Sequence, residues 1–335
     1  MIDVAVVGAT GYAGCELVRL LAGHPDVRIA SLHARDRHDT PLADEFPHLA
    51  PLRLTVSEGE PIDAQVVFLA LPSGKSALLA KRLVAGGATV IDIGSDLRLH
   101  APEAYPTWYG FEHPAPEALG SAVYGLTELV REQLRGATLI ANPGCYPTAA
   151  LLALAPFARQ LTGDVIVDAK SGISGAGRAA GRDYLFTELD GSTTAYGLAG
   201  HRHQPEIEQG LAAFGAGDTN LTFVPHLVPQ SRGILATCYM QLQDDMSDAE
   251  LTFTLNGCYA TEPFVHVVDR PPSTKATWGT NHAFLHVRRT GPRRAVVVSA
   301  IDNMGKGAAG QAVQNMNVAL GLTETAGLTA LAVYP

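Results

Sequence analysis

Hydrophobic positions follow one pattern over about the first 145 residues of the chain. Short runs of Val, Ile, Leu and Ala alternate there with stretches of helical period, such as residues 12–22. The runs are almost continuously apolar, which is typical of parallel strands covered on both faces. They predict strands at 3–8, 27–32, 64–71, 88–94 and 137–142. This alternation predicts a doubly wound, Rossmann-type parallel sheet of the α/β class.

The pattern changes after a helix that we predict over 147–160. Strand-like segments then follow one another with few helices between them, at 205–214 and about 248–260. The strand-like segments are 163–172, 221–229, 233–242, 263–269, 283–289 and 294–302. Clustered strands of this kind predict an α+β domain, dehydrogenase-like, with a mixed and mostly antiparallel sheet.

The length of the chain also predicts two domains, because 335 residues exceed one ordinary hydrophobic core. We place the boundary near residue 145, where the pattern changes. A last helical segment at 306–322 is long enough to return to the first domain. We therefore assign residues 1–145 and 306–335 to the first domain, and 146–305 to the second. A cofactor and a substrate are expected to meet in the cleft between them.

Composition narrows the class of protein. With 47 % hydrophobic and 17 % charged residues, the chain is typical of a soluble globular protein. Its net charge of −9 disfavours nucleic acid as a partner, since such binding needs clustered Lys and Arg. No apolar run approaches the roughly 18 residues that span a membrane, and no secretory signal precedes the first strand. We expect a cytoplasmic protein that acts on a small-molecule substrate.

One of the four cysteines stands at a special place. In "IANPGCYPTA", Cys145 lies where a strand ends and a helix begins. Helix N-termini stabilise thiolates, and ligands of open α/β sheets bind beyond the carboxyl ends of the strands. Cys145 is therefore the candidate nucleophile. The alternative is a small buried hydrophobe, which is our interpretation of Cys15, Cys238 and Cys258. No metal-finger spacing joins the four, which suits reduced thiols.

A thiolate beside a nicotinamide could attack an activated acyl group and expel its leaving group, and the resulting thioester would accept hydride. This route needs a general acid/base. The segment "GHRHQPEIEQ" offers His201 and His203, just before a helix that begins at Pro205. The pair could instead bind a metal or cap the helix, although no third ligand stands at metal-binding spacing. His226 is the next candidate acid/base.

The segment "GATGYAG" follows the first strand and places Gly8, Gly11 and Gly14 at the start of a helix. Small residues let the backbone approach a pyrophosphate, and the helix N-terminus favours its charge. The alternative is that a tight strand–helix turn requires the same glycines for packing alone. The strand–loop–helix–strand context favours a dinucleotide.

The end of the second strand indicates which dinucleotide is bound. Sites that prefer NAD usually place an acidic residue there for the ribose hydroxyls. This chain instead has Arg35 and Arg37, whose charge and forked geometry suit a 2′-phosphate. The alternative is a solvated basic turn. We predict NADP(H) as the cofactor.

Candidate anion-binding residues gather in "DAKSGISGAGR" and in "QSRGI". They combine cations, hydroxyls and free backbone amides, which suit a phosphate or a carboxylate. A flexible glycine-rich loop would explain the first segment as well. The candidate substrate-binding residues are Lys170, Ser171, Gly172, Arg178 and Arg232.

Several blocks of the sequence resemble the N-acetyl-γ-glutamyl-phosphate reductase family of arginine biosynthesis, in its type 1 form. They occur in the family's order and span essentially the whole chain, from residue 7 to residue 317. The cysteine block together with the "HRHQPEI" block is the most specific part of the resemblance. The blocks are "VGATGYAGCELVRLL", "NPGCYPTAALLAL", "DAKSGISGAGR", "AYGLAGHRHQPEIEQ", "PHLVPQSRGILAT" and "DNMGKGAAGQAVQNMN".

The resemblance implies an NADP-binding Rossmann-type domain joined to a catalytic and oligomerisation domain. It implies that Cys145 forms a thioester, that His201 and His203 supply the acid/base, and that the chain forms a homo-oligomer, a dimer or tetramer. The implied reaction is NADPH-dependent reductive dephosphorylation of N-acetyl-L-glutamyl 5-phosphate to the semialdehyde. Further cofactor contacts are expected at Thr10, Tyr12, Ala13, Pro72, Ser73 and Asn303.

The chain departs from the family at two places, and three alternatives stay open. His33-Ala34 stands where the family often has Thr-Ser, and Ser73-Gly74 stands where it often has His-Gly. Aspartate-semialdehyde dehydrogenase shares the chemical logic but not the histidine block. A related reductase of lysine biosynthesis acts on aminoadipyl phosphate attached to a carrier protein. A regulator that senses NADP would keep the glycine loop and have no use for Cys145.

Overall fold

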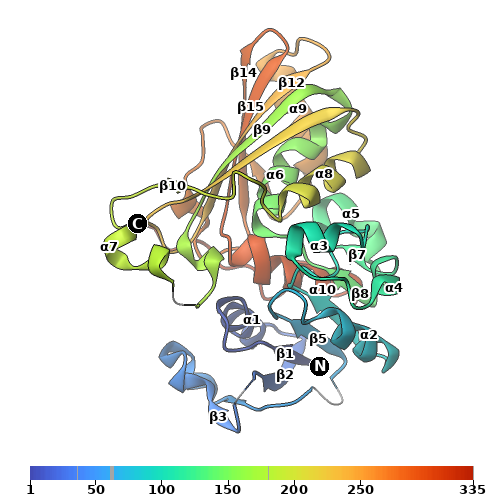
Figure 1. Ribbon diagram of the computed structural model, residues 1–335, viewed down its shortest axis with the longest axis vertical. Helices are drawn as coiled ribbons and strands as arrows, with labels where there is room; N and C mark the ends of the chain where they lie inside the picture. The colour runs from blue at the N-terminus through green and yellow to red at the C-terminus, as the bar shows by residue number, and fades with distance from the viewer. Residues whose placement is uncertain (36, 61–63, 180, 335) are drawn as a thin grey trace. The chain divides into compact units, whose positions relative to one another are not determined.

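The computed structural model describes residues 1–35, 37–60, 64–179 and 181–334. Its chain divides into two compact units (Figure 1). Unit 1 comprises residues 1–143 and 308–330, and unit 2 comprises residues 144–307 and 331–335. Within the described ranges, every helix is too short or too polar to cross a bilayer.

Unit 1 contains a six-stranded sheet in the order β2-β1-β5-β6-β8-β7, and every pair of neighbours in it is parallel. This confirms the predicted doubly wound sheet. The strands are β1 (Ile2–Val7), β2 (Val27–His33), β5 (Val66–Leu69), β6 (Thr89–Asp92), β7 (Val123–Tyr124) and β8 (Leu139–Ala141). A separate pair consists of β3 (Thr40–Pro41) and β4 (Thr55–Val56).

Helices bury both faces of this sheet, which explains its almost continuous apolar runs. One alternate set of strand residues, including Ala5, Val67 and Val90, forms a core with Ala77 and Ala80 of α2. The α-helices of the unit are α1 (Tyr12–Ala22), α2 (Ala77–Ala85), α3 (Ala104–Tyr109), α4 (Pro116–Leu119), α5 (Thr127–Leu134) and α10 (Gly310–Ala319). Two 3₁₀ turns are η1 (Leu42–Asp44) and η2 (Pro47–Leu52). Helix α10 packs against α1 and α5.

Unit 2 contains a seven-stranded sheet in the order β10-β11-β9-β12-β15-β14-β13. The pairs β9–β11 and β13–β14 are parallel, whereas the other pairs are antiparallel. The predicted mixed, mostly antiparallel sheet is therefore confirmed. Its strands are β9 (Leu161–Ser171), β10 (Thr194–Ala195), β11 (Thr219–Leu227), β12 (Ile234–Leu242), β13 (Val265–Val267), β14 (Ala283–Gly291) and β15 (Arg294–Ile301).

Helices cover one face of the seven-stranded sheet. The longer ones are α6 (Cys145–Leu154), α8 (Gln204–Ala213) and α9 (Asp248–Tyr259), with α6 on β12 and β15 and α9 on β13 and β14. Shorter helices of the unit, not all of which lie on the sheet, are η3 (Ala155–Gln160), η4 (Ile173–Ala176), η5 (Arg182–Tyr184), α7 (Phe186–Leu189), η6 (Thr274–Thr277) and the π-helical turn Gly305–Ala309. On the other face, Ile166 and Tyr239 remain 40 % and 46 % exposed.

Two predicted helices differ from the observed ones at their ends. The helix predicted over 147–160 begins at Cys145 and becomes a 3₁₀ helix after Leu154, where Pro156 lacks the amide that an α-helix needs. Pro147 is tolerated in the first turn because its missing N–H would have no partner within the helix. The helix predicted over 306–322 consists of the π-helical turn followed by α10.

The core of unit 1 contains a buried carboxyl group at the end of β6. Asp92 accepts hydrogen bonds from Ser76 Oγ at 3.0 Å and from the Gly94 amide at 2.9 Å. Burial, and secondarily the charge of Asp96, raise the pKa of Asp92 to about 7. The folded state therefore binds this proton more tightly than the unfolded chain does.

We predict that Asp92→Asn removes part of the pH dependence of stability. A raised carboxyl pKa contributes stability fully below about pH 4, and this contribution is lost as pH rises to about 7, by about 4 kcal/mol in total. Between pH 4 and 8, the melting temperature of the wild-type chain should fall relative to that of Asp92→Asn, measured by circular dichroism. Parallel pH profiles for the two proteins would contradict the prediction.

Candidate active site

The glycine loop after β1 has backbone geometry that only glycine allows. Gly8 has a φ of 92°, and a Cβ there would lie 2.2 Å from the carbonyl oxygen of Ala70. A Cβ at Gly14 would lie 2.2 Å from the Gly8 carbonyl oxygen. Gly11 is the N-cap of α1, which has no side-chain cap and no acidic residue in its first turn. The open end of α1 therefore fits the pyrophosphate of a dinucleotide.

The N-terminus of α2 is closed by a carboxylate of the chain itself. Asp96 accepts hydrogen bonds from the amides of Gly74, Ser76 and Ala77, at 2.7, 2.9 and 3.1 Å. Since these amides are already bonded, α1 rather than α2 offers its N-terminus to an external anion.

The remaining cofactor candidates of unit 1 lie at the same edge of the parallel sheet. Thr10, Tyr12 and Ala13 stand at the entrance of α1, and Pro72 and Ser73 follow β5. The close approach of Gly8 to Ala70 places these two segments side by side. Ser73 is fixed by a 2.7 Å hydrogen bond between its hydroxyl and that of Ser95.

The two arginines after β2 differ in their surroundings. Arg35 is exposed to solvent. Arg37 forms an ion pair with Glu45. Asp36, which separates them in the sequence, lies outside the described residues. Arg35 is therefore the better placed of the two to meet a 2′-phosphate.

The turn that carries Cys145 is held from two sides. Its N-cap residue, Gly144, donates its amide to Glu206 Oε1 at 2.7 Å. Glu206 is fully buried in the first turn of α8. On the other side Gly307 approaches so closely that a Cβ there would lie 2.8 Å from Cys145 Cβ. The sequence patterns did not single out Glu206 or Gly307, although Glu206 stands in the histidine block.

The other cysteines only partly follow our interpretation. Cys15 and Cys238 are buried, and burial raises the pKa of the Cys238 thiol to about 12. Cys258 is exposed on α9, so its interpretation as a buried hydrophobe is wrong. Its place in a helical pattern did not reveal which face it would occupy.

Aromatic and imidazole rings gather around Tyr146, the residue after Cys145. The ring centroids of His201 and His203 lie 5.9 and 5.8 Å from that of Tyr146, and 4.9 Å from each other. Tyr196 and Phe223 complete the group, at 5.5 and 5.3 Å from His201. The structure thus brings the predicted histidine pair to the start of α6.

The two histidines are not equivalent. His201 is half-buried, and its Nδ1 accepts the backbone amide of His203 at 3.1 Å. Burial, and secondarily the charge of Arg202, lower the pKa of His201 to about 4. His201 is therefore neutral at pH 7 and a weak base. His203 is the buried member of the pair, at 6 % exposure.

The predicted anion-binding residues fall into two groups. Ser171 is buried at the end of β9, and Gly172 approaches the backbone of Arg232 so closely that a Cβ would lie 2.8 Å from it. Arg232 Nε and Nη2 bond the buried carboxylate of Asp302 at 2.9 and 3.1 Å. Arg178 lies in the exposed loop that follows.

Lys170 belongs to the other group, because strand residues alternate between faces. The buried set of β9, with Ala169, faces the helices, whereas Lys170 projects from the open face with Asp168. Lys170 Nζ bonds Asp168 at 2.6 Å, and His226 Nδ1 lies 3.2 Å from the same carboxylate. Neither Lys170 nor His226 shares a face with α6.

Two further residues have contacts that the sequence did not reveal. Asn303 accepts the Gly233 amide at 2.7 Å and donates to Ser174 Oγ at 2.9 Å, so it ties the anion-binding segments of unit 2 together. Arg98 is buried in unit 1 and donates to the carbonyl oxygens of Asn142 and Ile93, at 2.9 and 2.8 Å. It therefore fixes Asn142, the residue that follows β8.

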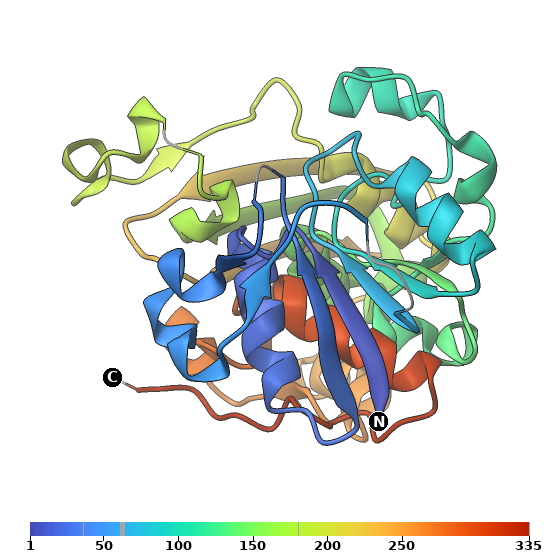
Figure 2. The ribbon, with the colours of Figure 1, turned by 90° about the horizontal axis from the view of Figure 1, so that it is seen from below.

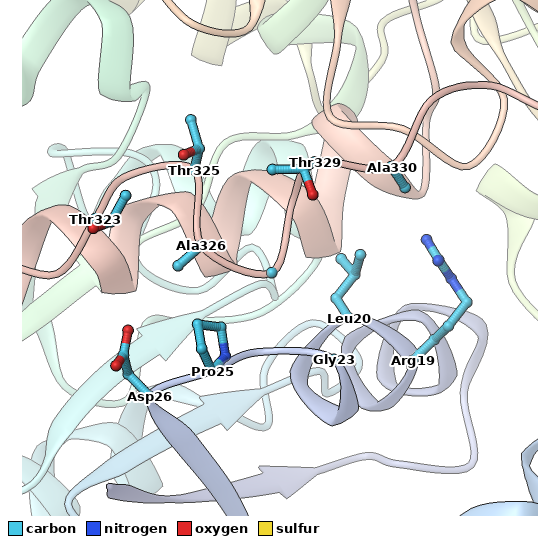
Figure 3. A pocket seen from close by; sticks show the side chains of 11 residues that line it. Arg19, Leu20, Gly23, Pro25, Asp26, Thr323, Thr325, Ala326, Thr329 and Ala330 are labelled. Carbon is cyan, nitrogen blue, oxygen red and sulfur yellow. The ribbon is translucent and has the colours of Figure 1, made fainter.

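A cavity of about 530 Å³ lies in unit 1, at the far end of α1 from the glycine loop. Figure 3 shows Arg19 and Leu20 of α1 on one side of it, with Thr329 and Ala330 of the C-terminal segment on the other. None of the residues that line it belongs to the candidate site. Among the described residues, no three His, Cys, Asp or Glu side chains gather as a metal ion would require.

Known protein families match the two parts of the chain separately. Residues 3–137 match the family model described as "Semialdehyde dehydrogenase, NAD binding domain", and residues 145–303 match "Semialdehyde dehydrogenase, dimerisation domain". The fold resembles aspartate semialdehyde dehydrogenase II from Vibrio cholerae, with a TM-score of 0.72 and 17 % identity over 95 % of this chain and 98 % of that one. Fold and site define an oxidoreductase of the semialdehyde dehydrogenase class.

Relatives over the full length specify the family. The N-acetyl-gamma-glutamyl-phosphate reductase of Brevibacillus brevis is 48 % identical over all of both chains. That of Dehalococcoides mccartyi is 47 % identical over 98 % of both chains, and that of Heliobacterium modesticaldum is 46 % identical over all of both. The chain belongs to the N-acetyl-gamma-glutamyl-phosphate reductase family, which confirms the resemblance.

We predict that the contact between Glu206 and Gly144 stabilises unit 2. Glu206→Ala leaves a buried amide without its acceptor, which should lower the free energy of unfolding by about 1–3 kcal/mol. Glu208→Ala is the matched control, since Glu208 is exposed on the same helix, and should change it by less than about 0.5 kcal/mol. Chemical denaturation measures both, and equal effects would contradict the prediction.

Proposed function

We propose that the chain reduces N-acetyl-L-glutamyl 5-phosphate to N-acetyl-L-glutamate 5-semialdehyde with NADPH and releases phosphate. The observation that carries this proposal is Cys145 at the start of α6, with the His201–His203 pair against the next residue. The full-length relatives bear the name of this reductase. The step belongs to arginine biosynthesis, and we place the enzyme in the cytoplasm.

Cys145 begins the reaction as a thiolate, which the N-terminus of α6 stabilises. Its sulfur attacks the acyl carbon of the acyl phosphate, and the carbon–oxygen bond to phosphate breaks with its electron pair leaving on phosphate. A thioester on Cys145 results. After reduction at the same carbon, the carbon–sulfur bond breaks, the aldehyde leaves, and the thiolate is restored.

Unit 1 holds the cofactor in this proposal. The amides at the entrance of α1, made accessible by Gly8, Gly11 and Gly14, bind the pyrophosphate. Arg35 meets the 2′-phosphate, which favours NADPH over NADH. Bound NADPH supplies the hydride that reduces the thioester carbon.

His203 is the residue that moves the proton. A general acid/base must change its protonation near the working pH, and His201, with its pKa of about 4, does not. We assign to His201 the orientation of the segment, because its Nδ1 accepts the His203 amide. His203 then shares its proton with the oxygen that carries charge during acyl transfer and reduction.

Anionic groups of the substrate meet the segment formed by Ser171, Gly172 and Arg232. The guanidinium of Arg232 is fixed by Asp302, so its direction is set before substrate arrives. Arg178 and Lys170 lie farther out in this assignment, at the exposed loop and the open face. Unit 2 also carries the family's dimerisation domain, and we infer that the chain forms a homo-oligomer.

We predict phosphate-dependent reduction of NADP with free N-acetylglutamate semialdehyde, followed at 340 nm in the absorbance of NADPH. Cys145→Ser should lower kcat by more than about 10³-fold, because the nucleophile is lost, while NADPH binding measured by fluorescence persists. Near-normal turnover by Cys145→Ser would overturn the thioester route. Activity only with an aminoadipyl substrate on an acidic carrier protein would move the enzyme to lysine biosynthesis.

We also predict unequal effects at the two histidines. His203→Asn should lower kcat by about 10²–10⁴-fold, since it removes the group that moves the proton. His201→Asn should lower kcat less, because its side chain only orients the segment. Steady-state kinetics of the two single variants decide the matter, and a larger loss in His201→Asn would reverse the assignment.

A further inference from the structure

A series of buried polar side chains in unit 1 joins α10 to the residue that follows β8. Helix α10, the red helix in Figure 2, lies against α5 and β6. Gln311 donates its side-chain amide to Thr127 Oγ1 at 2.6 Å, and Thr127 donates its hydroxyl to Asn315 Oδ1 at 2.6 Å. Asn315 in turn donates to Asn142 Oδ1 at 3.1 Å. Each of these four residues has 0 % exposure, so a missed hydrogen bond would be costly and the bonds constrain the side chains.

Backbone carbonyl groups decide which way the two asparagine side chains face. A carbonyl oxygen only accepts, so Asn315 must present its Nδ2 to the Gly125 oxygen, at 2.8 Å. Asn142 must likewise present its Nδ2 to the Ala308 oxygen, at 3.2 Å. The Asn142 Oδ1 atom therefore faces Asn315. Gly125 leaves the space for this arrangement, because a Cβ there would lie 2.4 Å from Asn315 Nδ2.

The backbone of Asn142 is held as firmly as its side chain. Its amide donates to the Asp92 carbonyl oxygen at 2.8 Å, and its own carbonyl oxygen accepts Arg98 Nε at 2.9 Å. Cys145 follows three residues later. Pro143 stands between them, and its ring fixes one of the backbone dihedral angles on the way. The conformation at Asn142 is therefore passed on to Cys145 through a short and restricted stretch of chain.

The side chain of Asn142 also holds the segment on the other side of Cys145. Its bond to Ala308 fixes the residue that directly follows Gly307. Gly307 lies so near Cys145 that a Cβ there would be 2.8 Å from Cys145 Cβ. Asn142 thus ties together the two stretches of chain that border the thiol, residues 142–145 and 305–308.

We propose that Asn315 is a positioning residue for Cys145 and acts through the side chain of Asn142. By fixing Asn142 it sets the direction in which the thiol projects at the N-terminus of α6, where a thiolate is stabilised. A displacement of about 1 Å at a reacting group can cost about 10²-fold in rate. This inference rests on the proposed function, in which Cys145 is the nucleophile.

Asn317 provides a matched control on the same helix. It is also an asparagine with 0 % exposure, but it bonds His24, Glu324 and Ala326 and so holds the C-terminal segment. Asn315→Ala should lower kcat by about 10²-fold with little change in the KM for NADP, because Asn142 loses its donor and the thiol its fixed direction. Asn317→Ala should destabilise the fold to a similar degree and keep kcat close to that of the wild-type chain.

Alkylation by iodoacetamide distinguishes positioning from a loss of fold. Mass spectrometry follows Cys145, and Cys258, which is exposed on α9, serves as the reference within the same molecule. In Asn315→Ala at pH 7, alkylation of Cys145 relative to Cys258 should slow by about 2–5-fold, since the thiolate loses support from the helix N-terminus. Unfolding would instead speed the alkylation of the buried Cys15 and Cys238. An unchanged or faster relative rate at Cys145 in folded Asn315→Ala would overturn the proposal.

Thr127 supplies a milder pair of variants, which decides the matter even if Asn315→Ala does not fold. Thr127→Ser keeps the hydroxyl that donates to Asn315 and should retain both kcat and the alkylation rate of Cys145. Thr127→Val keeps the shape without the hydroxyl, so both should fall, and identical behaviour of the two variants would refute the positioning role. A wild-type chain without reductase activity, whose Cys145 alkylation still depends on Asn315, would refute the proposed function and leave the positioning role supported.

Discussion

The carboxylate of Glu206 fixes the turn on which the site depends. A buried carboxylate is costly unless hydrogen bonds compensate it, and the Gly144 amide at 2.7 Å is one such partner. That bond holds the residue before Cys145 in an extended conformation, so that α6 begins with the thiol at its N-terminus. Gly307 closes the other side, because no side chain fits between it and Cys145. The position of Cys145 is thus set by close contacts on both sides.

Rigidity is unevenly distributed around this turn. Every residue of α6 from Tyr146 to Leu154 is buried, so the helix behind Cys145 has no freedom to shift without disturbing the core. Residues 173–200, between β9 and α8, lie at the other extreme, since none of their described side chains is buried. Tyr196 belongs to this segment, and its hydroxyl lies 3.1 Å from that of the buried Tyr146 in α6. The candidate nucleophile therefore stands at the start of a buried helix and not on this exposed segment.

At the edge of the parallel sheet, the site for an external anion depends on which helix N-terminus is already capped. Two helices, α1 and α2, begin at that edge with similar intrinsic attraction for anions. Asp96 occupies the amides of α2, whereas α1 has no side-chain cap. One internal carboxylate therefore gives the dinucleotide a single preferred helix. An internal carboxylate has a comparable role in unit 2, where Asp302 fixes the orientation of the Arg232 guanidinium.

The sequence by itself predicted the class of both sheets and all of their strands except β7 and β10, and it singled out the glycine loop, Cys145 and the histidine block as candidates. These features are local, because the period of burial and the conformation of a turn are encoded in neighbouring residues. It missed helices α3, α4 and α5, whose short segments have little periodicity. Only the tertiary structure decided that Glu206 meets Gly144, that Asn303 joins Ser174, and that Lys170 projects from the face opposite Ser171. Such contacts join residues far apart in the chain, or they depend on which face of a strand is covered. The pattern of neighbouring residues specifies neither of these.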